Sequence, residues 1–231
     1  MRRSEINRYI AEADAFFAEN SFALPPYAHW TLEEWRQHQF DTKELRTQRL
    51  GWDLTDFNQG QFERVGLTLF TLRNGSSAVT GAKPYAEKIM HVRVGQVTPF
   101  HYHARKTEDI INRGGRSGGH LVVQLYHLAE GGGFSKEPVR VSCDGIARMV
   151  DPGGVVTLGP GESVTLAPYL YHQFYAADED CLVGEVSSVN DDDADNFFRD
   201  PIPRYPEIVE DELPFRLLCA EYEGLRTVPA K

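Results

Sequence analysis

The chain has 231 residues, which is enough for one large domain or two small ones, and its hydrophobic content of 41% can fill a core. A net charge of −10 disfavours binding to the phosphate backbone of a nucleic acid. We expect no membrane span and no signal peptide, because no apolar stretch approaches 18 residues and none follows the first arginines. The three cysteines contain no CxxC pair and indicate reduced thiols in a cytoplasmic protein.

Two helices are predicted near the start of the chain. Residues 3–20 form the first, because apolar side chains recur at helical spacing between Ile6 and Phe17. We expect this amphipathic helix to pack on the outside of the remaining fold. Thr31, followed three residues later by Glu34, is a capping box that predicts a second, short helix.

The periodicity changes from helical to strand-like at Phe62 and stays so to about residue 190. Before this point, residues 50–57 (LGWDLTDF) resemble a loop that packs two aromatic side chains. Short strands separated by glycine-rich turns, such as Asp144-Gly145, favour an antiparallel barrel or sandwich. We therefore predict a mainly β protein with one domain, residues 1–231. It comprises a helical and loop extension at 1–60, a barrel core at 61–190 and a C-terminal loop and extension at 191–231.

A pattern of metal-binding residue types lies near the middle of the chain. His101 and His103 share one face of a predicted strand, about 7 Å apart along it at roughly 3.3 Å per residue. Glu108 follows, and His172 on a distant strand is the best candidate for a fourth ligand. Imidazoles with a carboxylate suit a first-row divalent metal. The alternative is an exposed strand that carries two histidines without a metal.

Three further residues are candidates for proton transfer. Lys88 lies among apolar neighbours in a predicted strand, where a lysine is costly unless it faces a pocket. Glu185 interrupts another apolar strand, so it is predicted either to act in proton transfer or to form an ion pair with Lys88 or an arginine. Lys106, between His103 and Glu108, either reaches the same site or is solvated.

Three residues are weaker candidates for substrate binding. Asp191 belongs to an acidic run that is more typical of a solvated turn, although one of its aspartates could bind a polyol. Arg204 could close the pocket, and Tyr171, beside His172, could form a stacking wall or belong to the core.

The spacing of these residues resembles the two signatures of the cupin family. Gly95, His101, His103, Glu108 and Gly115 match the first signature without a departure. In the second signature, the glycine and the histidine, residues 161 and 172, keep the family's separation, while the proline stands one place late and a tyrosine replaces the inner glycine. The resemblance implies a cupin-type antiparallel β-barrel (jelly-roll) whose mouth binds one metal through the four predicted ligands.

Longer motifs resemble the D-lyxose ketol-isomerase family across nearly the whole chain. They are FHYHARKTEDIINRGG, VSCDGI, PYLYHQF, GEVSSVNDDDADN and RYPEI. The resemblance implies a cytoplasmic, commonly dimeric cupin that uses Mn²⁺ to interconvert D-lyxose and D-xylulose, and often D-mannose and D-fructose.

For this reaction we expect Glu185 to move a proton between C2 and C1, with Lys88 and Lys106 assisting at the substrate oxygens. A hydride shift is the rival mechanism. The alternative functions are an iron-dependent cupin dioxygenase, an isomerase of phosphorylated sugars and a sugar-binding regulatory cupin. The phosphosugar reading ranks lower because the sequence shows no cluster of phosphate-binding cations.

Overall fold

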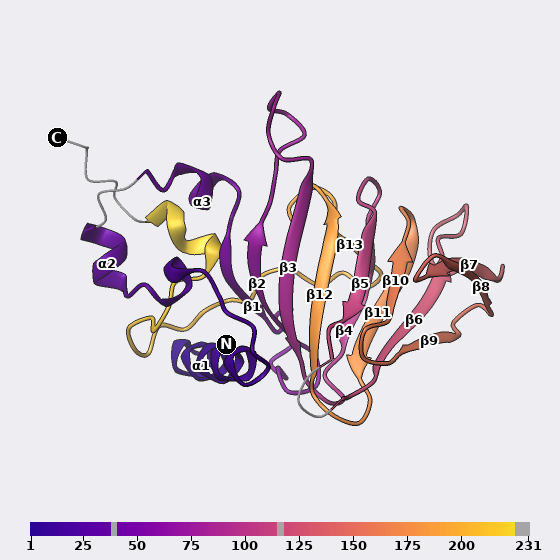
Figure 1. Cartoon of the computed structure of the whole chain (residues 1–231), viewed down its shortest axis with the longest axis horizontal. Coiled ribbons are helices and arrows are strands. Elements are labelled where there is room, and N and C mark those ends of the chain that lie inside the picture. The colour runs from indigo at the N-terminus through magenta and orange to yellow at the C-terminus, as the bar shows by residue number, and fades with distance from the viewer. Residues whose placement is uncertain (38–40, 115–117, 225–231) are drawn as a thin grey trace.

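The computed structural model describes residues 1–37, 41–114 and 118–224, so Gly115 and residues 225–231 lie outside it. Within these ranges the strands form two antiparallel sheets, one of eight strands and one of five (Figure 1). The strands are β1 (Gly51–Thr55), β2 (Leu67–Arg73), β3 (Tyr85–Val92), β4 (Thr98–Tyr102), β5 (Glu108–Asn112), β6 (Leu121–His127), β7 (Val139–Cys143), β8 (Ile146–Val150), β9 (Val155–Leu158), β10 (Ser163–Leu166), β11 (Leu170–Ala176), β12 (Cys181–Ser188) and β13 (Phe197–Phe198). The helices are α1 (Arg3–Glu19), α2 (Leu32–Gln37) and α3 (Lys43–Thr47), with 3-10 helices η1 (Pro26–His29) and η2 (Cys219–Gly224).

The two sheets enclose the main hydrophobic core. The larger sheet has the strand order β1-β2-β3-β12-β5-β10-β7-β8, and the smaller has the order β13-β4-β11-β6-β9. Met90 and Ile110 of the larger sheet belong to the same buried cluster as Val123, Leu125 and Phe174 of the smaller sheet. The prediction of a mainly β, cupin-type barrel is confirmed.

The interior of the barrel changes from apolar to polar along the central strand β12. Alternate side chains of a strand share one face, and on β12 Cys181 and Val183 belong to the apolar core while Glu185, two residues further on, continues the same face. On the neighbouring β3, Met90 and Lys88 show the same change. The polar end of the barrel interior is therefore where buried charges gather.

Helix α1 packs against the outer face of β1, β2 and β3, as Figure 1 shows. Its buried stripe includes Ile6, Ile10 and Phe17, which form a second core with Trp52 and Phe70 of the sheet. Helix formation here follows from the apolar period, which places this stripe on one side. The predicted exterior helix is confirmed.

Two local predictions are also confirmed. The Thr31 backbone N–H donates to Glu34 Oε2 at 2.7 Å, and the Glu34 N–H donates to Thr31 Oγ1 at 3.2 Å, which completes the capping box of α2. Asp144 and Gly145 connect β7 to β8 with φ angles of 51° and 81°, the left-handed pair that a type I′ hairpin turn requires.

The prediction of a loop at residues 50–57 is wrong for residues 51–55, which form strand β1. All five residues of β1 are buried, because Trp52 and Leu54 face the helices while Asp53 and Thr55 lie on the opposite face. The segment keeps the alternation of apolar and polar residues that is typical of a strand, so this strand was within reach of the sequence. The eight-stranded sheet thus begins inside the segment that the sequence assigns to the N-terminal extension.

None of the helices in the described part of the chain is long and apolar enough to cross a membrane.

Candidate metal centre and active site

Three histidines converge at the polar end of the barrel. His101 lies on β4, His103 follows the end of β4, and His172 lies on β11, directly opposite His101 in the strand pairing. Each offers one ring nitrogen within 4.8 Å of those of the other two, and all three side chains are buried. Two residues of one strand and one of its neighbour therefore present imidazoles to a common point.

The hydrogen bonds of the rings leave the inward nitrogens free to bind a cation. His101 and His172 each donate from Nδ1 to the carbonyl oxygen two residues earlier, at 2.8 and 3.0 Å, and His103 donates from Nδ1 to the carbonyl oxygen of Asp195. A carbonyl only accepts, so Nδ1 carries the hydrogen and Nε2 keeps a lone pair. Burial, together with the charge of Lys106, lowers the pKa of His103 to about 4. The neutral ring is the form that binds metals.

Glu108, the first residue of β5, completes the cluster. Its Oε1 lies 3.0 Å from His172 Nε2 and 3.7 Å from His103 Nε2. Within the described residues these three buried atoms have no hydrogen-bond partner. A 3.0 Å approach between two lone-pair atoms is not a hydrogen bond, and a cation between them would turn repulsion into attraction. The residues present therefore fit a divalent metal ion, and the structure brings all four predicted ligands together.

A row of buried charges extends from Glu108 into the barrel. Lys106 Nζ lies 2.6 Å from Glu108 Oε2 and 3.0 Å from Glu185 Oε1. Lys88, opposite Glu185 in the pairing of β3 with β12, places its Nζ 3.1 Å from the same Oε1. All four side chains are at most 6% exposed. The three residues predicted to act in proton transfer are thus neighbours of one another and of the metal cluster.

The lysines keep both buried carboxylates ionised. Burial alone would raise the pKa of Glu185, but the charges of Lys106 and Lys88 outweigh it and hold that pKa below its ordinary value. Burial opposes ionisation of Glu108 as well, yet Lys106 and His103 hold its pKa well below normal. Burial alone would lower the pKa of Lys106, and the charges of Glu108 and Glu185 raise it instead. At neutral pH the two carboxylates, Glu108 and Glu185, are therefore ionised on either side of the Lys106 ammonium group.

One of the three predicted substrate-binding residues lines the same pocket. Arg204 places Nη2 2.5 Å from Asp53 Oδ2 and 3.5 Å from Asp192 Oδ2, beside the lysines and the metal cluster. Burial alone would lower the pKa of Arg204, but the charges of Asp53 and Asp192 raise it. The aromatic rings of Phe57 and Phe198 also line this pocket.

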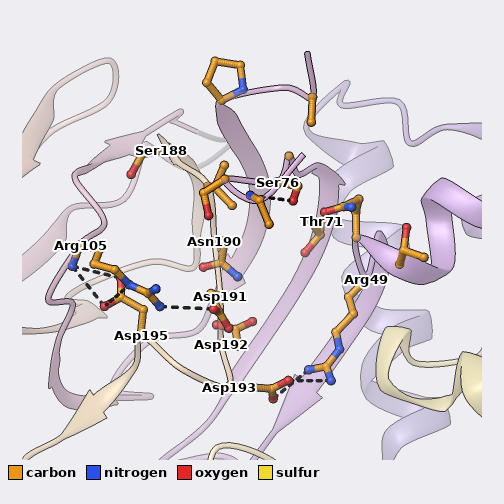
Figure 2. A pocket seen from close by; sticks show the side chains of 18 of the residues that line it. Arg49, Thr71, Ser76, Arg105, Ser188, Asn190, Asp191, Asp192, Asp193 and Asp195 are labelled. Atoms are coloured by element: carbon orange, nitrogen blue, oxygen red, sulfur yellow. Dashed lines mark hydrogen bonds and ion pairs between the residues drawn. The ribbon is translucent and has the colours of Figure 1, made fainter. Parts of the chain in front are cut away.

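The other two predicted substrate-binding residues lie elsewhere. Asp191 is exposed and accepts a hydrogen bond from Arg105 at 3.3 Å, in a neighbouring polar cavity of about 810 Å³ (Figure 2). Tyr171 occupies the face of β11 opposite to His172, with its ring centroid 4.9 Å from that of Tyr102 and 5.2 Å from that of Phe134. Adjacent residues of a strand point to opposite faces, so Tyr171 cannot line the pocket that His172 faces.

Sequence reasoning missed two polar members of the site. Asn190 accepts hydrogen bonds from Lys88 at 2.8 Å and Lys106 at 3.3 Å, and Asp192 lines the metal pocket. Asn190 could have been found from its place just after the strand that carries Glu185. In a run of consecutive aspartates, only the loop conformation decides which one points inward.

The fold and the cluster together define a cupin-type protein with a buried candidate metal centre. A family model described as D-lyxose isomerase matches residues 1–222, and the chain belongs to this family. The D-lyxose/D-mannose isomerase of Escherichia coli O157:H7 is 47% identical over 98% of this chain and 100% of the relative. That of Serratia proteamaculans is 46% identical over 96% of this chain and 98% of the relative.

Solved structures with a similar fold include L-ribose isomerases. The Cellulomonas parahominis protein has a TM-score of 0.59 at 17% identity and covers 90% of this chain and 98% of its own. The Acinetobacter sp. DL28 protein, solved with L-ribose, has a TM-score of 0.59 at 18% identity with the same coverage. At this identity the likeness shows the shared fold.

Proposed function

We propose that this protein is a metal-dependent aldose–ketose isomerase that interconverts D-lyxose and D-xylulose, and also D-mannose and D-fructose, as a cytoplasmic homodimer. The observation that supports the proposal is a buried carboxylate, Glu185, which one lysine separates from four candidate metal ligands, three histidines and Glu108. The specificity rests on family membership and on two relatives named D-lyxose/D-mannose isomerase that match over nearly their full length.

His101, His103, Glu108 and His172 would hold the metal, for which we propose Mn²⁺. A mixture of imidazole nitrogens and a carboxylate oxygen suits manganese and other first-row divalent ions. When bound, the cation supplies Lewis-acid polarisation of the substrate oxygens.

Glu185 is the proposed base at carbon. It takes the proton from C2 of the aldose while the C2–H electron pair forms the C1=C2 bond of an enediolate. It then returns the proton to C1, while the hydroxyl proton of O2 passes to O1 and O2 becomes the ketone oxygen. The lowered pKa of Glu185 keeps it ionised and able to accept this proton at neutral pH.

The cations around Glu185 act on the oxygens. Lys88 Nζ donates to Glu185 and Asn190 and has a third hydrogen for a substrate oxygen. Lys106 Nζ already contacts Glu108, Glu185 and Asn190, so a substrate oxygen would replace one of these three partners. Arg204 and Asp192, which line the same pocket, are proposed to bind sugar hydroxyls. The hydroxyl groups of a neutral sugar can accept hydrogen bonds from Arg204 and donate hydrogen bonds to Asp192.

The burial of Lys88 and Glu185 disfavours a regulatory cupin, which has no use for two ionised groups held out of water beside a metal centre. A cupin dioxygenase would use the same types of metal-ligand residue as the isomerase. Activity measurements therefore have to separate the two functions.

The test starts from chelator-stripped protein and follows D-lyxose conversion before and after addition of Mn²⁺. We expect activity only with metal, its loss in His101→Ala, and a decrease in kcat of about 10²–10⁴-fold in Glu185→Gln. The exposed Glu179→Gln is the matched control and should retain activity. Oxygen consumption with iron, without turnover of lyxose or mannose, would favour the dioxygenase.

The transferred hydrogen separates the two mechanisms. With D-lyxose deuterated at C2 in ordinary water, proton transfer through Glu185 allows partial loss of deuterium to solvent. A hydride shift delivers all of it to C1 of the ketose. Complete retention, together with an active Glu185→Gln variant, would remove Glu185 from the role of base.

A further inference from the structure

The loop that joins two metal ligands has no strand partner of its own. Strand β4 ends at Tyr102 and β5 begins at Glu108, so residues 103–107 lie outside both ladders. This loop contains His103 and Lys106. Its conformation therefore has to come from contacts with another part of the chain.

At the two ends of the loop, the Tyr169 N–H donates to the His103 carbonyl and the Ser188 N–H donates to the Thr107 carbonyl. Between these ends the contacts come from Asp195. Its Oδ1 accepts hydrogen bonds from the backbone N–H groups of Ala104 at 2.8 Å and Arg105 at 3.1 Å, and its Oδ2 accepts one from Lys106 at 3.0 Å. Figure 2 shows Asp195 beside Arg105 at the base of the polar cavity. Asp195 is 3% exposed, so three consecutive amides share one buried carboxylate. Hydrogen bonds to an ionised acceptor are about twice as strong as neutral ones.

The main chain of the same residue orients a metal ligand. The carbonyl oxygen of Asp195 accepts the hydrogen bond from His103 Nδ1, which directs the Nε2 lone pair of that ring into the cluster. One residue therefore determines both the tautomer of His103 and the path of the chain from His103 to Lys106 and Glu108. Partners of this kind typically change metal affinity by about 10–100-fold when they are altered.

We propose that Asp195 is a positioning residue of the metal centre, which acts through His103 and the 104–106 amides to set metal affinity and the placement of Lys106. The inference rests on the metal centre of the proposed function and does not depend on which sugar is the substrate. Asp195 differs from Asp191, Asp192 and Asp193 of the same acidic run because it accepts hydrogen bonds from three consecutive backbone amides, although all four carboxylates lie near an arginine.

The test compares Asp195→Asn and Asp195→Ala with the wild type. Asparagine keeps one oxygen acceptor but faces the remaining amides with an NH₂ group, whereas alanine removes all three bonds. Mn²⁺ affinity, measured by competition with a chromogenic chelator, should weaken in the order wild type, Asn, Ala, with about 10–100-fold loss for alanine. In the His103→Ala variant, adding Asp195→Ala should cause a clearly smaller further loss of Mn²⁺ affinity than the same substitution causes in the wild type. The reason is that part of the effect of Asp195 acts through the His103 ring.

Asp180 is the matched control, because it also accepts a backbone N–H, from Val94 at 2.9 Å, and contacts a histidine, His91, at 2.7 Å, without lining the metal pocket. Asp180→Ala should lower the melting temperature of the metal-free protein and leave Mn²⁺ affinity unchanged. Wild-type Mn²⁺ affinity in folded Asp195→Ala, or in Asp195→Asn if the alanine variant does not fold, would overturn the inference.

The outcomes also distinguish this inference from the proposed function. A wild-type protein that binds Mn²⁺ without converting any aldose overturns only the proposed function, and the Asp195 series remains decisive for the positioning role. A wild-type protein that binds no divalent ion overturns both.

Discussion

Lys106 stands between two carboxylates that would otherwise face each other out of water. Its Nζ contacts Glu108 on one side and Glu185 on the other, and the Lys106 side chain is 3% exposed. Removing one partner of a buried ion pair commonly costs about 3–5 kcal/mol, because an uncompensated charge is left behind. The residue therefore has a structural role that can be measured apart from catalysis.

We expect Lys106→Met to lower the free energy of unfolding of the metal-free protein by about 3–5 kcal/mol. The urea midpoint of the chelator-treated variant measures this loss. Lys83→Met is the control, since Lys83 pairs with Glu44 on the surface, where an ion pair contributes about 1 kcal/mol or less. Equal effects of the two substitutions would contradict the assigned charge arrangement. Adding Glu108→Gln to Lys106→Met should recover part of the loss, because Glu108 is the carboxylate left without a cation, whereas Glu185 keeps Lys88.

At the scale of the element, α1 and β1 show what a sequence pattern reveals. The apolar stripe of α1 repeats at helical spacing because one side faces solvent, and the helix was predicted nearly to its ends. Strand β1 lies between α1 and the barrel interior, so its polar residues are buried as well as its apolar ones. This segment was not recognised as a strand.

The ligands His101 and His103 were predictable because a strand places alternate residues on one face. Asp195 was not, because its contacts span about ninety residues of chain.

Phe17 tests how much the α1 layer contributes to stability. It is fully buried and stacks on Trp52 of β1 with ring centroids 6.0 Å apart. Phe17→Ala should lower the free energy of unfolding by about 3–5 kcal/mol, because it leaves a cavity between helix and sheet. The exposed Val79→Ala should change it by less than about 0.5 kcal/mol. A small effect of Phe17→Ala in urea unfolding would show that α1 is a loosely attached layer.

At the scale of the molecule, the C-terminal segment connects the site to the N-terminal helix. Arg204 reaches Asp53 in the pocket, and further along Glu210 and Glu221 pair with Arg3 of α1, which is 1% exposed. In Figure 1 the yellow end of the chain accordingly lies beside the indigo helices. The C-terminal segment thus closes onto β1 through Arg204, which lines the pocket, and onto α1 through Glu210 and Glu221. The barrel could be predicted from local periodicity, whereas this closure depends on ion pairs between residues far apart in the chain.

The buried histidines make the stability of the metal-free protein depend on pH. In the folded state the pKa of His103 is about 4, against about 6.5 for an unfolded histidine, so the unfolded state binds more protons between these values. Stability is therefore lost as pH falls through this window, by about 2 kcal/mol at pH 5 from His103 alone. The pKa of His101 is lowered in the same direction, chiefly by burial, and adds to the loss.

Urea unfolding of chelator-treated protein at pH 7, 6 and 5 measures this dependence. His103→Gln should reduce the change in the free energy of unfolding between pH 7 and 5 by about 2 kcal/mol, because glutamine has no proton to gain in either state. The exposed Val79→Ala removes no titratable group and should leave the slope close to that of the wild type. A constant wild-type stability would contradict the lowered pKa values. A stability that rises as pH falls would mean that the rings bind protons more tightly in the folded protein than in the unfolded chain. The Nε2 lone pairs would then be unavailable, and a cation could enter the cluster only by displacing protons.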